Sequence, residues 1–164
     1  MADKEYYIGL RDNYYWNYVY YDKQVNAIDY QITKLDNEKT KLNNTKTNYK
    51  NMNEKLESAK GNLTNAGIEY GNGSSALQKN YSSTEATKKV GEWTGLNGEI
   101  QAQINTIKQI LTQSLSKIEL LEKDINTKND SITTLKNKKN TYIEYRRRAW
   151  NNYIYYYNIV NNYS

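Results

Sequence analysis

The stretch LDNEKTKLNNTKTNYKNMNEKLESAKGNL, residues 35–63, has a large apolar or aromatic side chain at every seventh position and mostly polar residues between them. An α-helix returns to nearly the same face after seven residues, whereas a strand alternates its faces at every second residue. The stretch therefore predicts a helix that buries one stripe against another helix, as in a coiled coil. The seventh positions are Leu35, Leu42, Tyr49, Leu56 and Leu63.

The same spacing continues through the first half of the chain, from Tyr7 to Tyr70, without a polar interruption. A companion series completes the stripe and predicts one helix over about residues 4–69. We expect each of its members to follow a member of the first series, by four residues up to Ile32 and by three residues from Met52. Its members would be Tyr18, Val25, Ile32, Met52, Ala59 and Ala66.

The second half of the chain repeats the pattern and predicts a helix over about residues 99–160. Helices of about 60 residues rise roughly 90 Å, and ones with such polar surfaces fold only when their stripe has a partner. One series is interrupted only by Ser114 and Lys128. The two series are Ile104, Leu111, Ile118, Ile125 and Ile132, and Ile100, Ile107, Leu121, Leu135, Tyr142, Ala149, Tyr156 and Tyr163.

Residues 70–98 contain the densest helix-breaking signals. The segment GNGSS, residues 71–75, predicts the end of the first helix, because glycine tolerates the left-handed conformation of a helix end. Ser82 and Glu85 have the spacing of a capping box, which predicts a short helix towards Gly91. We therefore expect an all-α single domain over 1–164, a long antiparallel two-helix hairpin with a short helical connector.

The tyrosines support this pairing independently. If Ala66 lies opposite Ile100, the numbers of facing residues sum to about 165, which brings the first and last twenty residues together. Seven of the 18 tyrosines lie in residues 6–21 and seven in residues 142–163. The register predicts Tyr14 and Tyr15 near Trp150, and Tyr21 near Tyr142 and Tyr145.

This aromatic tip contains more rings than one seam can bury. Some tyrosines replace Leu or Phe in the seam, but others must stay exposed, and exposed Tyr and Trp are typical of protein interfaces. The run Arg146–Arg148 is either a solvated helical turn stacked on rings or a contact for an anionic surface. A membrane-surface role is disfavoured because exposed aliphatic bulk is lacking. The expected partner-binding residues are Tyr14, Tyr15, Trp16, Tyr18, Trp150, Tyr153 and Tyr157.

Composition argues against several classes of function. The chain has no Cys or His, so it offers no thiol nucleophile, imidazole base or usual transition-metal ligand. Its carboxylates are scattered, and GNGSS is not followed by Lys as a phosphate loop would be. We expect no enzyme activity, no cofactor and no metal site. The net charge is +5, but the basic residues are interspersed with acidic ones along the chain. We therefore expect no nucleic-acid partner.

The segment ALQKNYSSTEATKKVGEWTGLNGEIQAQINTIKQILTQSLSKI, residues 76–118, resembles the WXG family, small helical-hairpin proteins exported by type VII secretion systems of Gram-positive bacteria. It resembles more closely the small proteins that accompany LXG toxins, which look like WXG proteins with longer helices. The resemblance implies that Trp93 and Gly95 form the turn motif between the helices. It also implies a Tyr-x-x-x-Asp/Glu export motif, whose letters fit Tyr18 with Asp22 and Tyr81 with Glu85. We take Tyr18 and Asp22 as the candidate because residues four apart project from one helix face.

The resemblance implies a non-enzymatic helical partner that binds the N-terminal domain of an LXG toxin, alone or with a second small helical protein, and presents it for type VII secretion. Such a protein is cytoplasmic before export and can leave the cell without a cleaved signal peptide. The start MADKEYYIGL is unlike a signal peptide, and no apolar run is long enough to span a bilayer. The alternatives are a self-assembling structural coiled coil, which would be a homo-oligomer, and a membrane-surface protein.

Overall fold

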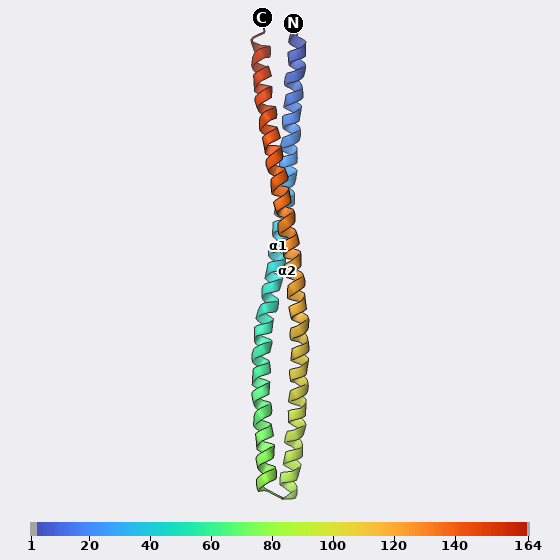
Figure 1. Cartoon of the computed structure of the whole chain (residues 1–164), viewed down its shortest axis with the longest axis vertical. Helices are drawn as coiled ribbons and strands as arrows, with labels where there is room; N and C mark the ends of the chain where they lie inside the picture. The colour runs from blue at the N-terminus through green and yellow to red at the C-terminus, as the bar shows by residue number, and fades with distance from the viewer. Residues whose placement is uncertain (1–2, 164) are drawn as a thin grey trace. The chain divides into compact units, whose positions relative to one another are not determined.

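The chain folds into two long helices, α1 over Lys4–Asn80 and α2 over Thr84–Asn161, joined by residues 81–83. The computed structural model describes residues 3–163, and within that range it contains no strand. The two helices run antiparallel and pack side by side (Figure 1). The predicted all-α helical hairpin is confirmed.

Short polar side chains start both helices. The Asp3 carboxylate accepts a hydrogen bond from the backbone N–H of Tyr6 at 2.9 Å. The Ser83 hydroxyl accepts one from the backbone N–H of Ala86 at 3.2 Å. Each is an N-cap that satisfies one of the free donors of a first helical turn. Because α1 ends at Asn80 and α2 begins at Thr84, the turn between the helices is only three residues long.

The predicted helical connector over 70–98 is wrong. The segment 71–75 lies inside α1, which continues to Asn80, and Gly91, Gly95 and Gly98 lie inside α2. No described glycine has a positive φ. Tertiary packing along the seam overrides the local preference of glycine to end a helix. The capping signal near Ser82 does mark a helix start, but the cap is Ser83 and the helix is α2 itself.

Contacts divide the chain into two compact units, so the expected single domain is a hairpin with two packed regions. Unit 1 comprises the chain up to Lys41 with the chain from Asp124, and unit 2 comprises Leu42–Lys123. The buried apolar residues in unit 1 are Val25, Ile28, Ile125, Ile132, Ala149 and Val160. Those in unit 2 are Ala86, Ile104, Leu111 and Ile118.

The stripe of α2 is largely the predicted one, but the companion series of α1 differs in unit 2. Met52 and Ala59 are exposed, and Asn53, Lys60 and Gly67 take the inward positions instead. The observed positions continue the unbroken series of sevens from Val25, whereas the predicted shift by one residue would rotate the stripe by about 100°. Long lysines serve at such positions because their methylene stems pack while their amines reach water.

Ion pairs across the two helices fix the register. Each unit can be checked separately: Arg146 pairs with Asp22 at 2.6 Å in unit 1, and Lys46 with Glu122 at 3.6 Å in unit 2. In both pairs the residue numbers sum to 168, close to the predicted 165. The predicted alignment of the two helices is therefore correct to within one helical turn. No helix of the described chain contains an apolar stretch suited to crossing a lipid bilayer.

Candidate aromatic interface

Six rings from both helices of unit 1 form one continuous cluster, which we call the first aromatic cluster. Trp150 packs on Tyr18 across the hairpin with ring centroids 5.0 Å apart, and Tyr153 packs on Tyr15 at 5.6 Å. Trp150 and Tyr153 contact each other at 5.2 Å. Trp16 and Tyr157 extend the cluster outward by edge and tilted contacts. Its members are Tyr15, Trp16, Tyr18, Trp150, Tyr153 and Tyr157.

This cluster stays accessible to solvent. Trp16 is 65% exposed, and Tyr15, Trp150 and Tyr157 are each exposed by about two-fifths. Tyr18 and Tyr153 form its half-buried floor. Two helices can bury only the sides that face each other, so the outer rings of the cluster have no cover within the chain. Rings in such a position offer a large apolar contact area to another protein.

Six of the seven predicted partner-binding residues thus come together, and the seventh, Tyr14, lies in a second cluster. Tyr14 stacks on Tyr156 with centroids 5.6 Å apart and an interplanar angle of 5°. It does not reach Trp150, which packs one turn further along α1, on Tyr18. Burial, followed by the neighbouring phenols, raises the pKa of the Tyr156 hydroxyl above 10.0. Tyr14 is therefore a seam residue rather than part of the exposed face.

A third group of rings confirms another detail of the predicted register. Tyr21 lies 6.0 Å from Tyr142 and 5.4 Å from Tyr145, measured between ring centroids. Lys138 lies over the Tyr142 ring, with its amine 5.8 Å from the centroid. The predicted contacts of Tyr21 are therefore confirmed, whereas the predicted contact of Tyr14 with Trp150 is replaced by one with Tyr156.

The candidate export motif, Tyr18 and Asp22, is engaged by α2. The Tyr18 ring packs on Trp150. The Asp22 carboxylate accepts a hydrogen bond from Arg146 at 2.6 Å and another from the Asn26 side chain at 3.4 Å. Both residues project from one side of α1, as expected of residues four apart, but that side faces the partner helix of the hairpin. A docking protein would meet them together with Trp150 and Arg146.

A hollow of about 420 Å³ adjoins the first aromatic cluster. Arg146 is held on one side of it by Asp22. Arg147 pairs with Glu144 one turn earlier on the same helix, at 2.9 Å, and this bond together with its charge lowers the pKa of the Glu144 carboxyl below 4.5. The hollow thus combines apolar walls with two guanidinium groups. Its lining residues are Tyr18, Ile143, Arg146, Arg147 and Trp150.

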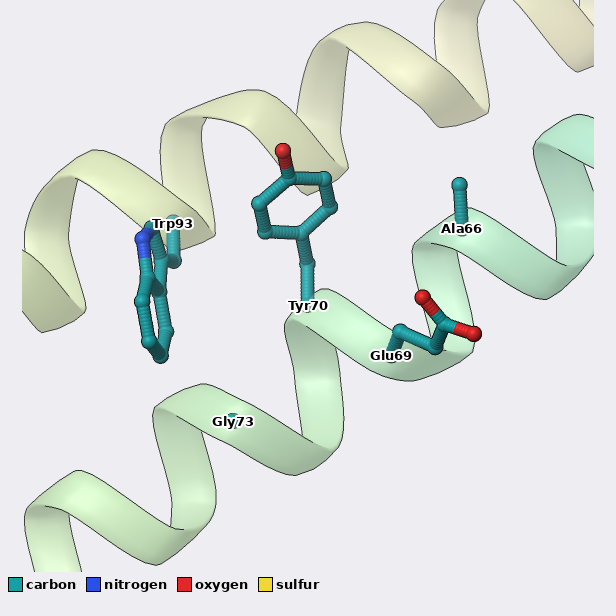
Figure 2. Close-up of a pocket in the computed structure, with 5 residues that line it drawn as sticks. All are labelled: Ala66, Glu69, Tyr70, Gly73 and Trp93. Carbon is teal, nitrogen blue, oxygen red and sulfur yellow. The ribbon is translucent and has the colours of Figure 1, made fainter.

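Trp93 and Gly95 do not form the turn, so that prediction is wrong. Both lie inside α2, about three turns from its start, and Trp93 occupies a seam position, seven residues after Ala86 and seven before Ile100. Its indole extends from α2 over Gly73 of α1, beside Tyr70, whose ring centroid is 6.3 Å away (Figure 2). A Cβ at position 73 would lie 2.7 Å from the Trp93 ring. Gly95 has no heavy atom near its missing Cβ.

Within the described range, residues 3–163, there is no cluster of three or more acidic, His or Cys side chains suited to a metal ion. Comparison of the chain with protein-family models, curated proteins and solved structures gave no match.

Sequence reasoning missed two parts of this picture. Ile143 lines the hollow beside the cluster and was not predicted, although it lies seven residues before Trp150 on the same side of α2. Gly73 receives Trp93, and their numbers sum to 166. The register that places Ala66 opposite Ile100 already paired these two positions, so it could have identified the contact.

Proposed function

We propose that this chain is a non-enzymatic helical partner protein that binds the N-terminal domain of an LXG-type toxin and presents it for type VII secretion. The observation that carries the proposal is the first aromatic cluster, a connected set of rings that the hairpin leaves exposed. The resemblance of residues 76–118 to WXG-like proteins supplies the class of partner. The mechanism is completion of a helical bundle, in which toxin helices cover the rings.

The energetic argument concerns apolar area. A buried aromatic side chain removes 150–250 Å² from water, at roughly 25 cal/mol per Å². Covering three rings that are exposed by about two-fifths removes about 240 Å² from water and supplies roughly 6 kcal/mol. That is of the order of the cost of association, so the remaining contacts along the toxin helices complete the affinity. Such interfaces are typically dominated by a few Trp, Tyr and Arg residues. The first aromatic cluster and the adjoining arginines have this composition.

The experiment is co-purification with an LXG N-terminal domain encoded beside this chain. We expect a complex of defined stoichiometry by light scattering coupled to size exclusion. Trp150→Ala should weaken it at least tenfold, whereas Tyr30→Ala, which removes an equally aromatic but isolated ring that is 74% exposed, should not. Secretion of the toxin should fall with Trp150→Ala. A chain that stays alone in the presence of the domain contradicts the proposal.

Self-association is the second candidate, because the same exposed rings would also suit another copy of the hairpin. Sedimentation of the isolated chain distinguishes the two. A stable homo-oligomer that the toxin domain does not dissociate favours a self-assembling structural coiled coil. Liposome co-sedimentation at low salt tests the membrane-surface alternative.

A further inference from the structure

One side of unit 1 carries a mostly apolar stripe on each helix, with one charged residue in each, Arg147 and Asp12. On α2 the residues at the spacing of one helical face combine two aromatic and two aliphatic side chains around Arg147. On α1 the matching stripe lies along the other edge of the same side, next to Trp16. The α2 stripe consists of Ile143, Arg147, Trp150, Ile154 and Tyr157, and the α1 stripe of Ile8, Asp12, Tyr15 and Val19. The rings of Tyr15, Trp150 and Tyr153 connect the two edges.

The two arginines of the hollow differ in how firmly they are held. Arg146 bonds across the hairpin to Asp22, and both side chains are about two-thirds buried. Arg147 is 63% exposed and pairs only within its own helix, with Glu144, which is 50% exposed. An exposed pair of this kind contributes about 0–1 kcal/mol. Arg147 can therefore exchange Glu144 for a carboxylate from another molecule at little cost.

The charge of the surrounding helix favours an acidic occupant. Residues 124–163 contain seven basic side chains and three acidic ones. On the α1 edge, Asp12 is already paired with Arg11 at 2.7 Å. A second copy packed with its α2 on this α2 would bring the same basic helix against itself. A different helix whose apolar stripe is flanked by Glu or Asp matches both the rings and the arginines.

We propose that this side of unit 1 is a groove for an amphipathic helix of another protein, which lays its apolar stripe on the first aromatic cluster and places a carboxylate against Arg147. This deepens the proposed function, on which it rests for the use of the same surface, by naming the chemistry of the partner. The apolar stripe supplies affinity, and the carboxylate sets the position of the helix along the groove.

The test uses two labelled 25-residue helical peptides with the same Leu/Ala stripe, one flanked by Glu and the other by Lys, in fluorescence anisotropy at low salt with the full chain. The Glu peptide should bind at least about tenfold more tightly. Arg147→Glu should abolish or reverse that preference. The matched control is Arg148→Glu, because Arg148 lines a different hollow with Tyr14 and Tyr21 and should keep the preference.

Equal binding of the two peptides, or binding of neither, overturns the inference. So does an equal effect of the Arg147 and Arg148 substitutions, which would indicate attraction by net charge alone. A dimer of the isolated chain that Trp150→Ala dissociates would show that a second copy covers the groove. Because no toxin domain is present, the outcome is independent of the test of the proposed function: the acidic peptide can bind where the toxin domain does not, and the reverse.

Discussion

Trp93 packs against Gly73 because only a residue without a side chain leaves room for an indole so close to the α1 backbone. The nearest ring atoms lie 2.7 and 3.1 Å from where a Cβ would be. Glycine costs a helix interior about 1 kcal/mol relative to alanine. At position 73 that cost is offset by the contact, whereas at Gly95 no neighbouring atom offsets it.

Replacing these two glycines by alanine should therefore have opposite effects. Gly73→Ala should destabilise the hairpin by about 1–3 kcal/mol, because the ring must move out of the seam. Gly95→Ala should stabilise it by up to about 1 kcal/mol through helix propensity alone. Urea unfolding followed by circular dichroism measures both. Equal stabilisation by the two substitutions would show that Trp93 does not rest on Gly73.

Ser114 is a polar residue buried among the apolar residues of the seam. It is 3% exposed, and its hydroxyl has no hydrogen-bond partner among the described residues. The register places it opposite Asn53, whose side-chain oxygen is also buried without such a partner. Polar residues at seam positions lower stability but restrict the alignments that two helices can adopt.

Ser114→Ala should raise the free energy of unfolding by about 1 kcal/mol, because a buried unsatisfied hydroxyl is removed. Ser116→Ala is the control: it gives the same gain in helix propensity at an exposed position. The difference between the two in urea unfolding isolates the effect of burial. If the exposed substitution stabilises as much, the hydroxyl of Ser114 carries no penalty.

Each helix as an element follows from its seven-residue pattern rather than from local propensity. The series from Ile104 to Ile132 was predictable because every member is aliphatic, and the structure buries all of them. The breaks at 71–75 and 91–98 were mispredicted because a glycine signal is local, whereas the contact of Gly73 with Trp93 joins residues twenty apart. The inward positions of Asn53 and Lys60 were missed because hydrophobicity alone favours Met52 and Ala59.

The ion pair of Glu38 on α1 with Lys128 on α2 makes the stability of the hairpin depend on pH. A hydrogen bond from Lys128 at 2.6 Å, and then its charge, lower the pKa of the Glu38 carboxyl below 4.5. The folded state therefore favours the ionised form, and the pair stabilises the hairpin above pH 4.5. That contribution disappears as the pH falls through the lowered pKa.

Glu38→Gln should slightly lower the melting temperature at pH 7 and should reduce its fall as the pH drops below 4.5. The reason is that the amide cannot gain the proton that destabilises the wild-type pair. Melting curves at a series of pH values measure this. An unchanged acid dependence in the variant would mean that Glu38 and Lys128 do not interact in solution.

No side chain is fully enclosed in the described residues. The meeting of the two chain ends was predictable from the register that places Ala66 opposite Ile100, and the tyrosine distribution agreed with it. Which rings would remain outside was not, since Tyr14 and Tyr15 are adjacent in sequence yet turn to different clusters.

The most direct measurement of the central claim is hydrogen–deuterium exchange on the chain alone and mixed with the LXG N-terminal domain. We expect binding to slow amide exchange in residues 8–22 and 143–157, which carry the exposed rings, and to leave residues 91–98 nearly unchanged. Slowed exchange around 91–98 with none at the aromatic residues, or no change anywhere, would contradict the account.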